Sequence, residues 1–281
     1  MCDNRRAAKV LMKAATSSAL APAMERSDDF AAQAGNPDFV LSLARGLRVI
    51  ESFEGHPEGR SIVEIAHSTG LSRASIRRIL LTLELLGYVE HSRQVHRLRT
   101  QVLRLGFAFL SSSSVVEAAR PVLERITDQV HESSSMSMLD GEEIVYVARS
   151  AASRVLAVGL SVGSRLPAFC TSMGRVLLAA LPDARLNSYL SELKPSAYTP
   201  KTITRLPQLR KAILEVRKQG YALVDEELEA GLRSIAVPIF TRSNQVVAAI
   251  NVGTHVSRAT LLSNCLPALQ EGARTLRSIL I

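Results

Sequence analysis

Residues 61–87, SIVEIAHSTGLSRASIRRILLTLELLG, restrict the fold of this chain more than any other segment, because they predict two helices joined by a tight turn. Ser61 and Glu64 have the spacing of a capping box, in which each side chain accepts a hydrogen bond from the other residue's backbone. Gly70 stands where the first helix must end, because glycine adopts the left-handed conformation without a Cβ clash. Ser72 is placed to cap the second helix.

Apolar residues recur along one face of each of these two helices. In the first helix they are Ile62, Ile65 and Ala66, and in the second they are Ile76, Ile79, Leu80 and Leu83. This spacing places the side chains against a core. An upstream helix carrying Leu43, Leu47 and Ile50 is expected to complete a three-helix core. The polar residues left at the start and on the outer face of the second helix are Ser72, Arg73, Ser75, Arg77 and Arg78.

Arginines on an outer helix face are usually just solvated, but the surrounding pattern here favours contact with DNA. An arginine can bind guanine O6 and N7, or hold a phosphate, through its planar fork of donors. The turn between the helices is short and contains glycine, as a helix-turn-helix requires. Residues 88–91 and 94–99 then read as two strands around Ser92 and Arg93, which predicts a β-wing. The candidate DNA contacts are Ser72, Arg73, Ser75, Arg77, Arg78, Arg93, Arg97 and Arg99, the last three for backbone phosphates.

The composition favours a two-domain protein with a polyanionic partner. A chain of 281 residues exceeds the usual length of one domain, and 47% apolar residues suffice for sizeable cores. A net charge of +8 and a pI of about 9.8 favour a nucleic-acid partner without requiring one. The scattered cysteines Cys2, Cys170 and Cys265 predict no disulfide framework, metal site or cofactor, and fit a reducing cytoplasm. No apolar run approaches the length of about 20 residues that spans a membrane.

The chain is expected to divide into four segments. Residues 1–38 are expected to form a disordered extension, and residues 39–100 a winged helix-turn-helix. Residues 101–114 read as a linker helix that ends in a polar break at 111–114. Residues 115–281 are expected to form the second domain.

The second domain is predicted to be α+β around an antiparallel sheet, because strands joined by hairpins alternate with helices. Pro121 is expected to open a helix with Val122 and Ile126 on its buried face. Asp140 and Gly141 form a hairpin signal between two strands. Strands are expected at residues 134–139, 144–148, 155–161, 221–224, 234–240 and 246–252. Helices are expected at residues 172–181, 184–193, 206–219 and 262–280.

An enzymatic alternative rests on a short motif in this domain. Residues 159–163, GLSVG, match the G-x-S-x-G pattern with Ser161 as the nucleophile. Asp225 and His255 follow in the order of a hydrolase triad, but that fold requires a strand-to-helix turn above a mostly parallel sheet. Residues 164–167 instead read as an extended or turn segment, with no helix before about Ser172. A serine hydrolase is therefore the minority interpretation, at odds of roughly one in twenty for an isolated motif, and no enzyme is expected.

Longer motifs resemble the IclR family of bacterial transcription regulators over residues 39–281. They are SLARGLRVIESF at 42–53, LSRASIRRILLTLELLGYV at 71–89, GSRLPAFCTSMGRVLLAALP at 163–182, GYALVDEELEAGLRSIAVPI at 220–239 and VVAAINVGT at 246–254. The resemblance is greatest to the subgroup that controls protocatechuate, 4-hydroxybenzoate and β-ketoadipate catabolism. It implies a winged helix-turn-helix, a linker helix and a GAF-like effector domain. It also implies a homodimer or tetramer that binds an operator in duplex DNA and can recruit RNA polymerase.

The resemblance further implies where a small organic acid would bind in the second domain. The effector residues implied by position are Ser172, Met173, Leu232, Ser234 and Asn251. Arg165 and Arg233 are candidate partners for the acid's carboxylate, since arginine binds carboxylates bidentately, and Arg233 can instead pair with Asp225. Val224 stands where relatives that bind small α-keto acids carry an aspartate, which argues against such a ligand. A DNA-binding protein whose sensor no longer functions is the third alternative.

Overall fold

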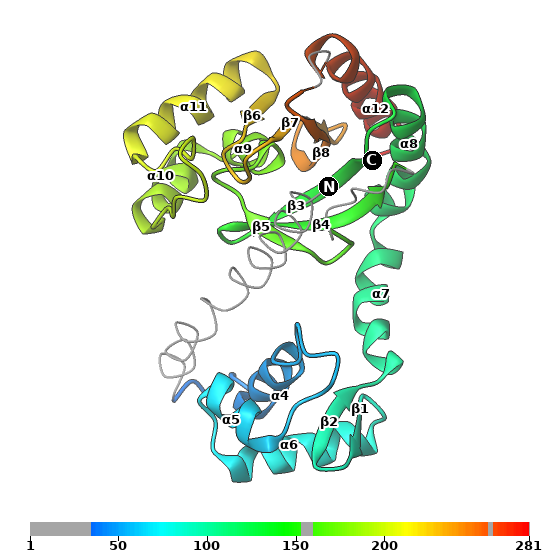
Figure 1. The fold of residues 1–281 in the computed structure, drawn as a ribbon, viewed down its shortest axis with the longest axis vertical. Coiled ribbons are helices and arrows are strands. Elements are labelled where there is room, and N and C mark those ends of the chain that lie inside the picture. Colours follow the sequence, from blue (N-terminus) through cyan, green and yellow to red (C-terminus); the bar gives the residue numbers. More distant parts are fainter. Residues whose placement is uncertain (1–34, 153–159, 258–260, 281) are drawn as a thin grey trace, which may run out of the picture. The chain divides into compact units, whose positions relative to one another are not determined.

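The computed structural model describes residues 35–152, 160–257 and 261–280 of the chain (Figure 1). It separates into two compact units, one up to Phe109 and one from Leu110 onward. Residues 1–34 of the expected extension and residues 155–159 of an expected strand lie outside the described residues. Among the described residues no single helix is long and apolar enough to cross a membrane, although the bent pair Thr100–Ser112 and Ser114–Val130 passes that test together.

The first unit contains the two helices predicted within residues 61–87, the upstream helix and a two-stranded hairpin. Its elements are α4 (Leu41–Glu51), α5 (Ile62–Thr69), α6 (Arg73–Leu85), β1 (Val89–Ser92), β2 (Val95–Leu98), the short 3-10 helix η1 (Thr100–Val102) and most of α7 (Leu103–Ser112). Its core consists of Val49, Phe53, Ile65, Ile76, Leu80, Leu83 and Val89. The predicted buried faces of α5 and α6 are therefore confirmed, with Ile62, Ala66 and Ile79 packed at the margin of that core.

The predicted ends of α5 and α6 are confirmed as well. The Ser61 hydroxyl accepts a hydrogen bond from the Glu64 backbone at 3.3 Å, and the Glu64 carboxylate accepts one from the Ser61 backbone at 2.8 Å. Gly70 ends α5 at φ 70°, in the left-handed region. The Ser72 hydroxyl caps α6 by accepting a hydrogen bond from the Ser75 backbone at 3.2 Å.

The prediction of which residues of α4 face the core is largely wrong. Val49 is fully buried and Phe53, just past the helix end, is 5% exposed, whereas Leu43 and Leu47 are 61% and 47% exposed. Only Ile50, at the margin of the core, lies where it was expected. Both faces of α4 carry apolar residues, so helical periodicity alone cannot decide which face the rest of the unit covers.

The second unit is built on a six-stranded sheet in which every neighbouring pair is antiparallel, as predicted. The strand order is β5-β4-β3-β8-β7-β6. The strands are β3 (Ser134–Asp140), β4 (Glu143–Ser150), β5 (Arg165–Pro167), β6 (Ala222–Asp225), β7 (Leu232–Phe240) and β8 (Val246–His255). The helices are α8 (Ser114–Val130), α9 (Ser172–Ala179), α10 (Asp183–Glu192), α11 (Leu206–Gln219) and α12 (Leu266–Ile279), with a π-helical turn η2 (Leu261–Cys265) before α12.

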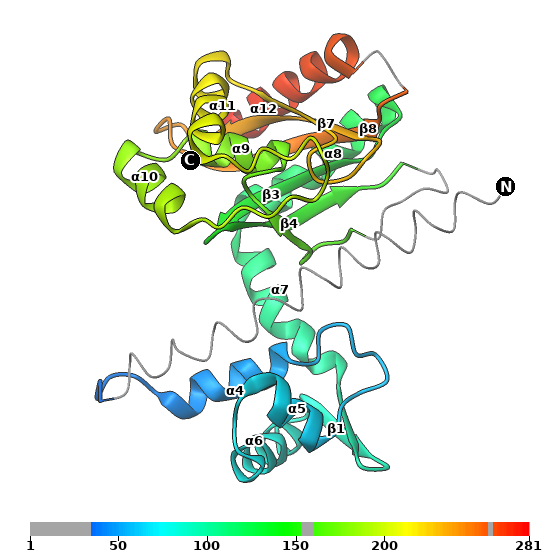
Figure 2. The same cartoon turned by 60° about the vertical axis from the view of Figure 1, so that its left-hand side comes forward.

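Helices cover both faces of the sheet, so the unit has two cores (Figures 1 and 2). The helices α8 and α12 pack on one face, around residues such as Met136, Ile250 and Val252. The helices α9, α10 and α11 enclose the other face, around residues such as Tyr146 and Ala249. Side chains alternate along a strand, so the residues next to Met136, Ile250 and Val252 point to the opposite face. That face, covered by α9, is called the α9-covered face.

The start of α8 differs from the sequence expectation. The expected polar break at residues 111–114 is confined to Ser113, since α7 ends at Ser112 and α8 begins at Ser114. Pro121 therefore lies inside a helix that it was expected to open. An interior proline costs about 3 kcal/mol, and burial of Val115 and Val116 in the core helps to offset that cost.

A buried ion pair holds α9 in place. The Arg175 guanidinium bonds the Glu227 carboxylate at 2.6 Å and the Phe169 carbonyl at 3.0 Å, and both charged side chains are less than 10% exposed. The same carboxylate accepts a hydrogen bond from the Ile203 backbone at 3.2 Å. This network joins α9 to the segments before α11 and after β6, and so fixes the helix that covers one face of the sheet.

A glycine sets how closely the preceding loop approaches α9. A Cβ built on Gly174 would lie 2.1 Å from the Ala168 carbonyl oxygen and 2.4 Å from the Ala168 Cα. Real Cβ atoms do not approach backbone so closely, so only glycine fits at this point of the helix.

We predict that Gly174→Ala destabilises the second unit by about 3 kcal/mol, because the new methyl group must push backbone aside. Urea unfolding of the full chain, followed by circular dichroism, measures this change. The matched control is Gly46→Ala in α4, where a Cβ meets nothing within 4 Å. The control should be neutral or stabilising by about 0.5–1 kcal/mol, and equal effects of the two substitutions would contradict the prediction.

We predict that Glu227→Ala destabilises the second unit by about 3–5 kcal/mol, because it leaves the buried Arg175 charge without a partner. The double variant Arg175→Met/Glu227→Leu should recover much of this loss, since no charge then remains buried. The exposed Glu215→Ala is the control and should change the unfolding free energy by less than about 0.5 kcal/mol. A double variant less stable than Glu227→Ala would show that the ion pair itself is required.

Candidate functional site

The outer face of α6 presents a group of unpaired cations. Arg73, Arg77 and Arg78 are exposed, and within the described part of the chain none of them has a carboxylate partner. Ser72 and Ser75 lie at the N-terminal end of the same helix, joined by the capping hydrogen bond. The helix start therefore combines backbone N–H groups, hydroxyls and guanidinium groups, all of which can bind phosphate or base edges.

The hairpin after α6 has the shape expected of a wing, but its turn is one residue later than predicted. Ser92 pairs with Val95, so the turn residues are Arg93 and Gln94 rather than Ser92 and Arg93. Both turn residues have positive φ, 48° and 73°, as the type I′ hairpin turn requires. Sequence reasoning missed this turn because neither residue is one that usually adopts the left-handed conformation.

The three arginines of the wing differ in how exposed their side chains are. Arg93 at the tip and Arg99 after β2 are exposed, whereas Arg97 within β2 is half-buried. The hairpin is anchored close to its turn, because Arg60 and His96 form a backbone bridge and the His91 and His96 rings stack with centroids 4.5 Å apart. Burial lowers the pKa of His96 below its ordinary value, which favours a neutral ring at this anchor.

The α9-covered face of the sheet in the second unit carries a row of polar side chains. Ser135 on β3 lies directly opposite Arg149 on β4 and Asn251 on β8. Ser135 and Asn251 are buried, and Arg149 is half-buried and donates to the Ser135 hydroxyl at 3.0 Å. By strand alternation Leu232 and Ser234 on β7 face the same side, since Ile235 packs in the opposite core.

Two buried hydroxyls on the α9-covered side of the sheet have no hydrogen-bond partner among the described residues. They are the Oγ atoms of Ser137, on β3 opposite Tyr146, and Ser172, the first residue of α9. An unsatisfied buried hydroxyl costs about 1–3 kcal/mol. Burial also raises the pKa of Tyr146 to about 12, so its phenol remains protonated. Together with the fully buried Met173, these groups offer both apolar and hydrogen-bonding contacts on the α9-covered side of the sheet.

The two arginines that the sequence suggested as carboxylate partners are already paired. Arg165, on the edge strand β5, donates to Glu143 at 2.7 Å and to Asp140 at 2.6 Å. Arg233 donates to Asp225 at 2.7 Å, which is the internal pairing considered as an alternative. The predicted effector residues on the α9-covered side are thus Ser172, Met173, Leu232, Ser234 and Asn251, and Arg165 is at the sheet edge.

Sequence reasoning missed Ser135, Ser137 and Arg149. The run SSMSM at 134–138 alternates serine with methionine, which in a strand directs hydroxyls to one face. Arg149 ends an apolar strand, where a charged residue is unusual. These signals were available, but only the pairing of β4, β3 and β8 shows that they belong to one site.

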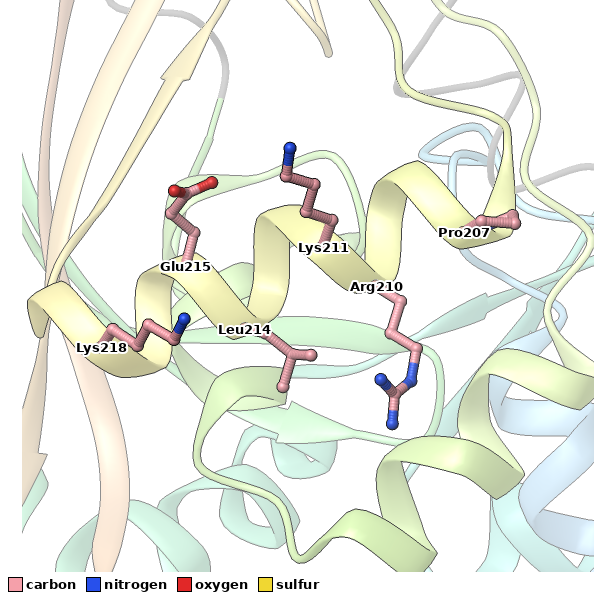
Figure 3. A pocket seen from close by; sticks show the side chains of 6 residues that line it. All are labelled: Pro207, Arg210, Lys211, Leu214, Glu215 and Lys218. Atoms are coloured by element: carbon pink, nitrogen blue, oxygen red, sulfur yellow. The ribbon is translucent and has the colours of Figure 1, made fainter.

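A surface groove of about 270 Å³ lies elsewhere, along α11 (Figure 3). It is lined by Pro207, Arg210, Lys211, Leu214, Glu215 and Lys218, all from one helix. Figure 3 shows Lys211 and Glu215 pointing away from Arg210 and Leu214, so the polar groups do not converge on one point. None of the predicted effector residues contributes to this groove.

The residues of the hydrolase alternative do not form a triad in the described structure. The Asp225 carboxylate is bonded to Arg233 at 2.7 Å and Lys201 at 2.9 Å. His255 Nδ1 contacts the Ser257 hydroxyl at 2.9 Å. Ser161 lies in a turn, where its backbone N–H bonds Ser164, and not at a strand-to-helix junction.

Known proteins resemble this chain along most of its length. The family model for the IclR helix-turn-helix domain matches residues 42–93, and the model for the bacterial transcriptional regulator IclR C-terminal region matches residues 107–277. The Pca regulon regulatory protein of Pseudomonas putida is 47% identical over 266 residues, which cover 92% of this chain and 91% of that protein. The p-hydroxybenzoate hydroxylase transcriptional activator of Acinetobacter baylyi is 33% identical, over 86% and 90% of the two chains.

A solved structure with the same fold adds a bound ligand. The IclR homologue from Microbacterium hydrocarbonoxydans, crystallised in complex with 4-hydroxybenzoate, superposes with a TM-score of 0.74. It is 26% identical and covers 85% of this chain and 98% of its own. The C-terminal family model alone matches more than half of the residues of this chain, which therefore belongs to the IclR family of bacterial transcriptional regulators.

Proposed function

We propose that this regulator binds a small aromatic carboxylic acid, or the acid formed by ring cleavage, and in response alters transcription of aromatic-acid catabolic genes. The observation that carries the proposal is the pair of buried hydroxyls of Ser137 and Ser172, on the α9-covered side of the sheet, which lack hydrogen-bond partners among the described residues. A bound molecule with hydroxyl or carboxylate groups would satisfy them. The names of the Pseudomonas and Acinetobacter relatives, and the 4-hydroxybenzoate in the Microbacterium homologue, support this class of ligand.

We propose that the start of α6 contacts base edges and that the wing contacts phosphates. Arg73, Arg77 and Arg78 are exposed and lack carboxylate partners among the described residues, so their donors are available. The N-terminal turns of a recognition helix are the part that reaches the bases. Arg93 and Arg99 are exposed on the wing. Their neighbours Ser72, Ser75 and Arg97 complete the proposed contact set.

We propose that the functional form is a homodimer or tetramer, with two recognition helices on half-sites about 34 Å apart or a multiple of this distance. The exposed Leu43 and Leu47 on α4 support association, because large apolar side chains on one helix face favour burial against another chain. Ligand binding would then act by favouring one arrangement of the two copies. The favoured arrangement either fits the operator better or contacts RNA polymerase.

We predict that Arg77→Ala and Arg78→Ala each weaken binding to an operator selected from a random duplex library by about 1–3 kcal/mol, and relax its sequence preference. Arg97→Ala should instead lower the dependence of affinity on salt by about one unit of slope. Fluorescence anisotropy at several salt concentrations measures both effects. Arg185→Ala, an exposed arginine on α10, controls for the loss of charge. Unchanged affinity in both α6 variants would refute the recognition-helix assignment.

We predict that the full chain binds at least one of 4-hydroxybenzoate, protocatechuate and β-ketoadipate in isothermal titration calorimetry. Ser172→Ala should weaken that binding by about 0.5–1.5 kcal/mol, because the ligand loses a hydrogen bond in a buried site. Ser191→Ala, an exposed serine on α10, is the matched control and should bind as the wild type does. Absence of heat with all three acids would reject the ligand class while leaving the DNA-binding proposal intact.

A further inference from the structure

Arg149 on β4 is a half-buried cation without a counter-ion among the described residues. Its guanidinium donates to the Ser135 hydroxyl at 3.0 Å, which leaves most of its five donors available. Burial lowers the pKa of Arg149, and the Tyr146 phenol acts in the opposite direction. An arginine does not lose its proton in a protein, so the charge remains and requires an anion.

Other buried or half-buried arginines described in this unit have such an anion. Arg175 bonds Glu227 at 2.6 Å, Arg165 bonds Glu143 at 2.7 Å, and Arg233 bonds Asp225 at 2.7 Å. The two internal gaps in the described structure, SRVLAVG at 153–159 and RAT at 258–260, contain no acidic residue in their sequence. No carboxylate from those gaps can therefore complete the pairing of Arg149.

The groups beside Arg149 are neutral hydrogen-bonding side chains. Ser135 and Asn251 continue its row across β3 and β8, and Ser137 lies one step further along β3, opposite Tyr146. The face thus offers one positive charge at β4 and a set of hydroxyl and amide groups next to it. This matches a molecule with a carboxylate at one end and hydroxyl or keto oxygens elsewhere.

We propose that Arg149 binds the carboxylate of the effector acid, and that Asn251 and the unpartnered Ser137 hydroxyl receive the acid's other polar groups. This inference rests on the proposed function and assigns the role that the sequence had given to Arg165 or Arg233. The bond is a charge-assisted, bidentate pair between guanidinium and carboxylate. Arg149 therefore contributes to affinity, and it also selects acids over uncharged analogues of the same shape.

The proposal also makes a statement about the ligand-free protein. A desolvated charge without a partner destabilises the fold, and the penalty is removed when an anion binds or when the charge is deleted. A substitution at Arg149 that keeps the size of the side chain should therefore leave the ligand-free protein as stable as the wild type or more stable. A structural arginine would behave in the opposite way.

The test is calorimetric titration of the full chain with whichever of 4-hydroxybenzoate, protocatechuate and β-ketoadipate binds the wild type, and with the amide of that acid. Arg149→Gln should weaken binding of the acid by about 10- to 100-fold, the effect of losing hydrogen bonds to a charged group. Its affinity for the amide should stay within about threefold of the wild-type value. The affinity of Arg149→Lys for the acid should lie between the affinities of the wild type and of Arg149→Gln, because lysine keeps the charge but cannot bind bidentately.

The control is Arg165→Gln, which removes an equally charged but already paired arginine and should leave acid binding within about threefold. Thermal unfolding of each ligand-free variant identifies a variant that fails to fold. The proposal is overturned if Arg149→Gln binds the acid as the wild type does, or loses acid and amide equally together with stability. It is overturned as well if Arg165→Gln shows the acid-specific loss instead. A wild type that binds none of the acids contradicts the proposed ligand class first, and this inference with it.

Discussion

The buried ion pair between Arg175 and Glu227 determines where α9 lies, and the enclosure of the α9-covered face of the sheet depends on that helix. Because the pair reaches from the helix to the loop after β6, a shift of either element would expose or separate two desolvated charges. Gly174 adds a steric limit on the same helix, since the Ala168 backbone leaves no room for a side chain. Ser172 and Met173 are therefore held over the sheet by electrostatics and close packing together, not by apolar contact alone.

Local signals in the sequence predicted the fold well wherever one residue type has one physical role. The capping box at Ser61, the left-handed glycines at helix ends and the antiparallel hairpins all follow from backbone geometry, and all are present. The failures arose where packing decides between alternatives that look alike locally. Both faces of α4 are apolar, and Pro121 is compatible with a helix start, so only the tertiary core reveals that Leu43 is exposed and that α8 begins earlier.

Sequence motifs suggested some residues of the candidate site but not all of them. Family motifs pointed to Ser172 on α9 and to Ser234 and Asn251, whose strands direct them to the α9-covered face. Arg165 and Arg233, the arginines suggested as carboxylate partners, lie near those motifs along the chain. Arg165 is paired with Glu143 and Arg233 with Asp225, in each case a residue on the neighbouring strand. Arg149 is distant in sequence from Asn251 and joins it only through β3, so its place beside the site follows from strand register, which no local pattern encodes.

The left-handed turn at Arg93 and Gln94 has a consequence for how such a protein can evolve or be engineered. Each of these residues holds a backbone conformation that disfavours side chains by roughly 1–2 kcal/mol. An asparagine-glycine turn would form the hairpin more readily, but it would leave the outermost point of the wing without a guanidinium. Thermal stability alone would therefore favour a different sequence at this turn, and the residues present keep a guanidinium at its outermost point despite the unfavourable backbone conformation.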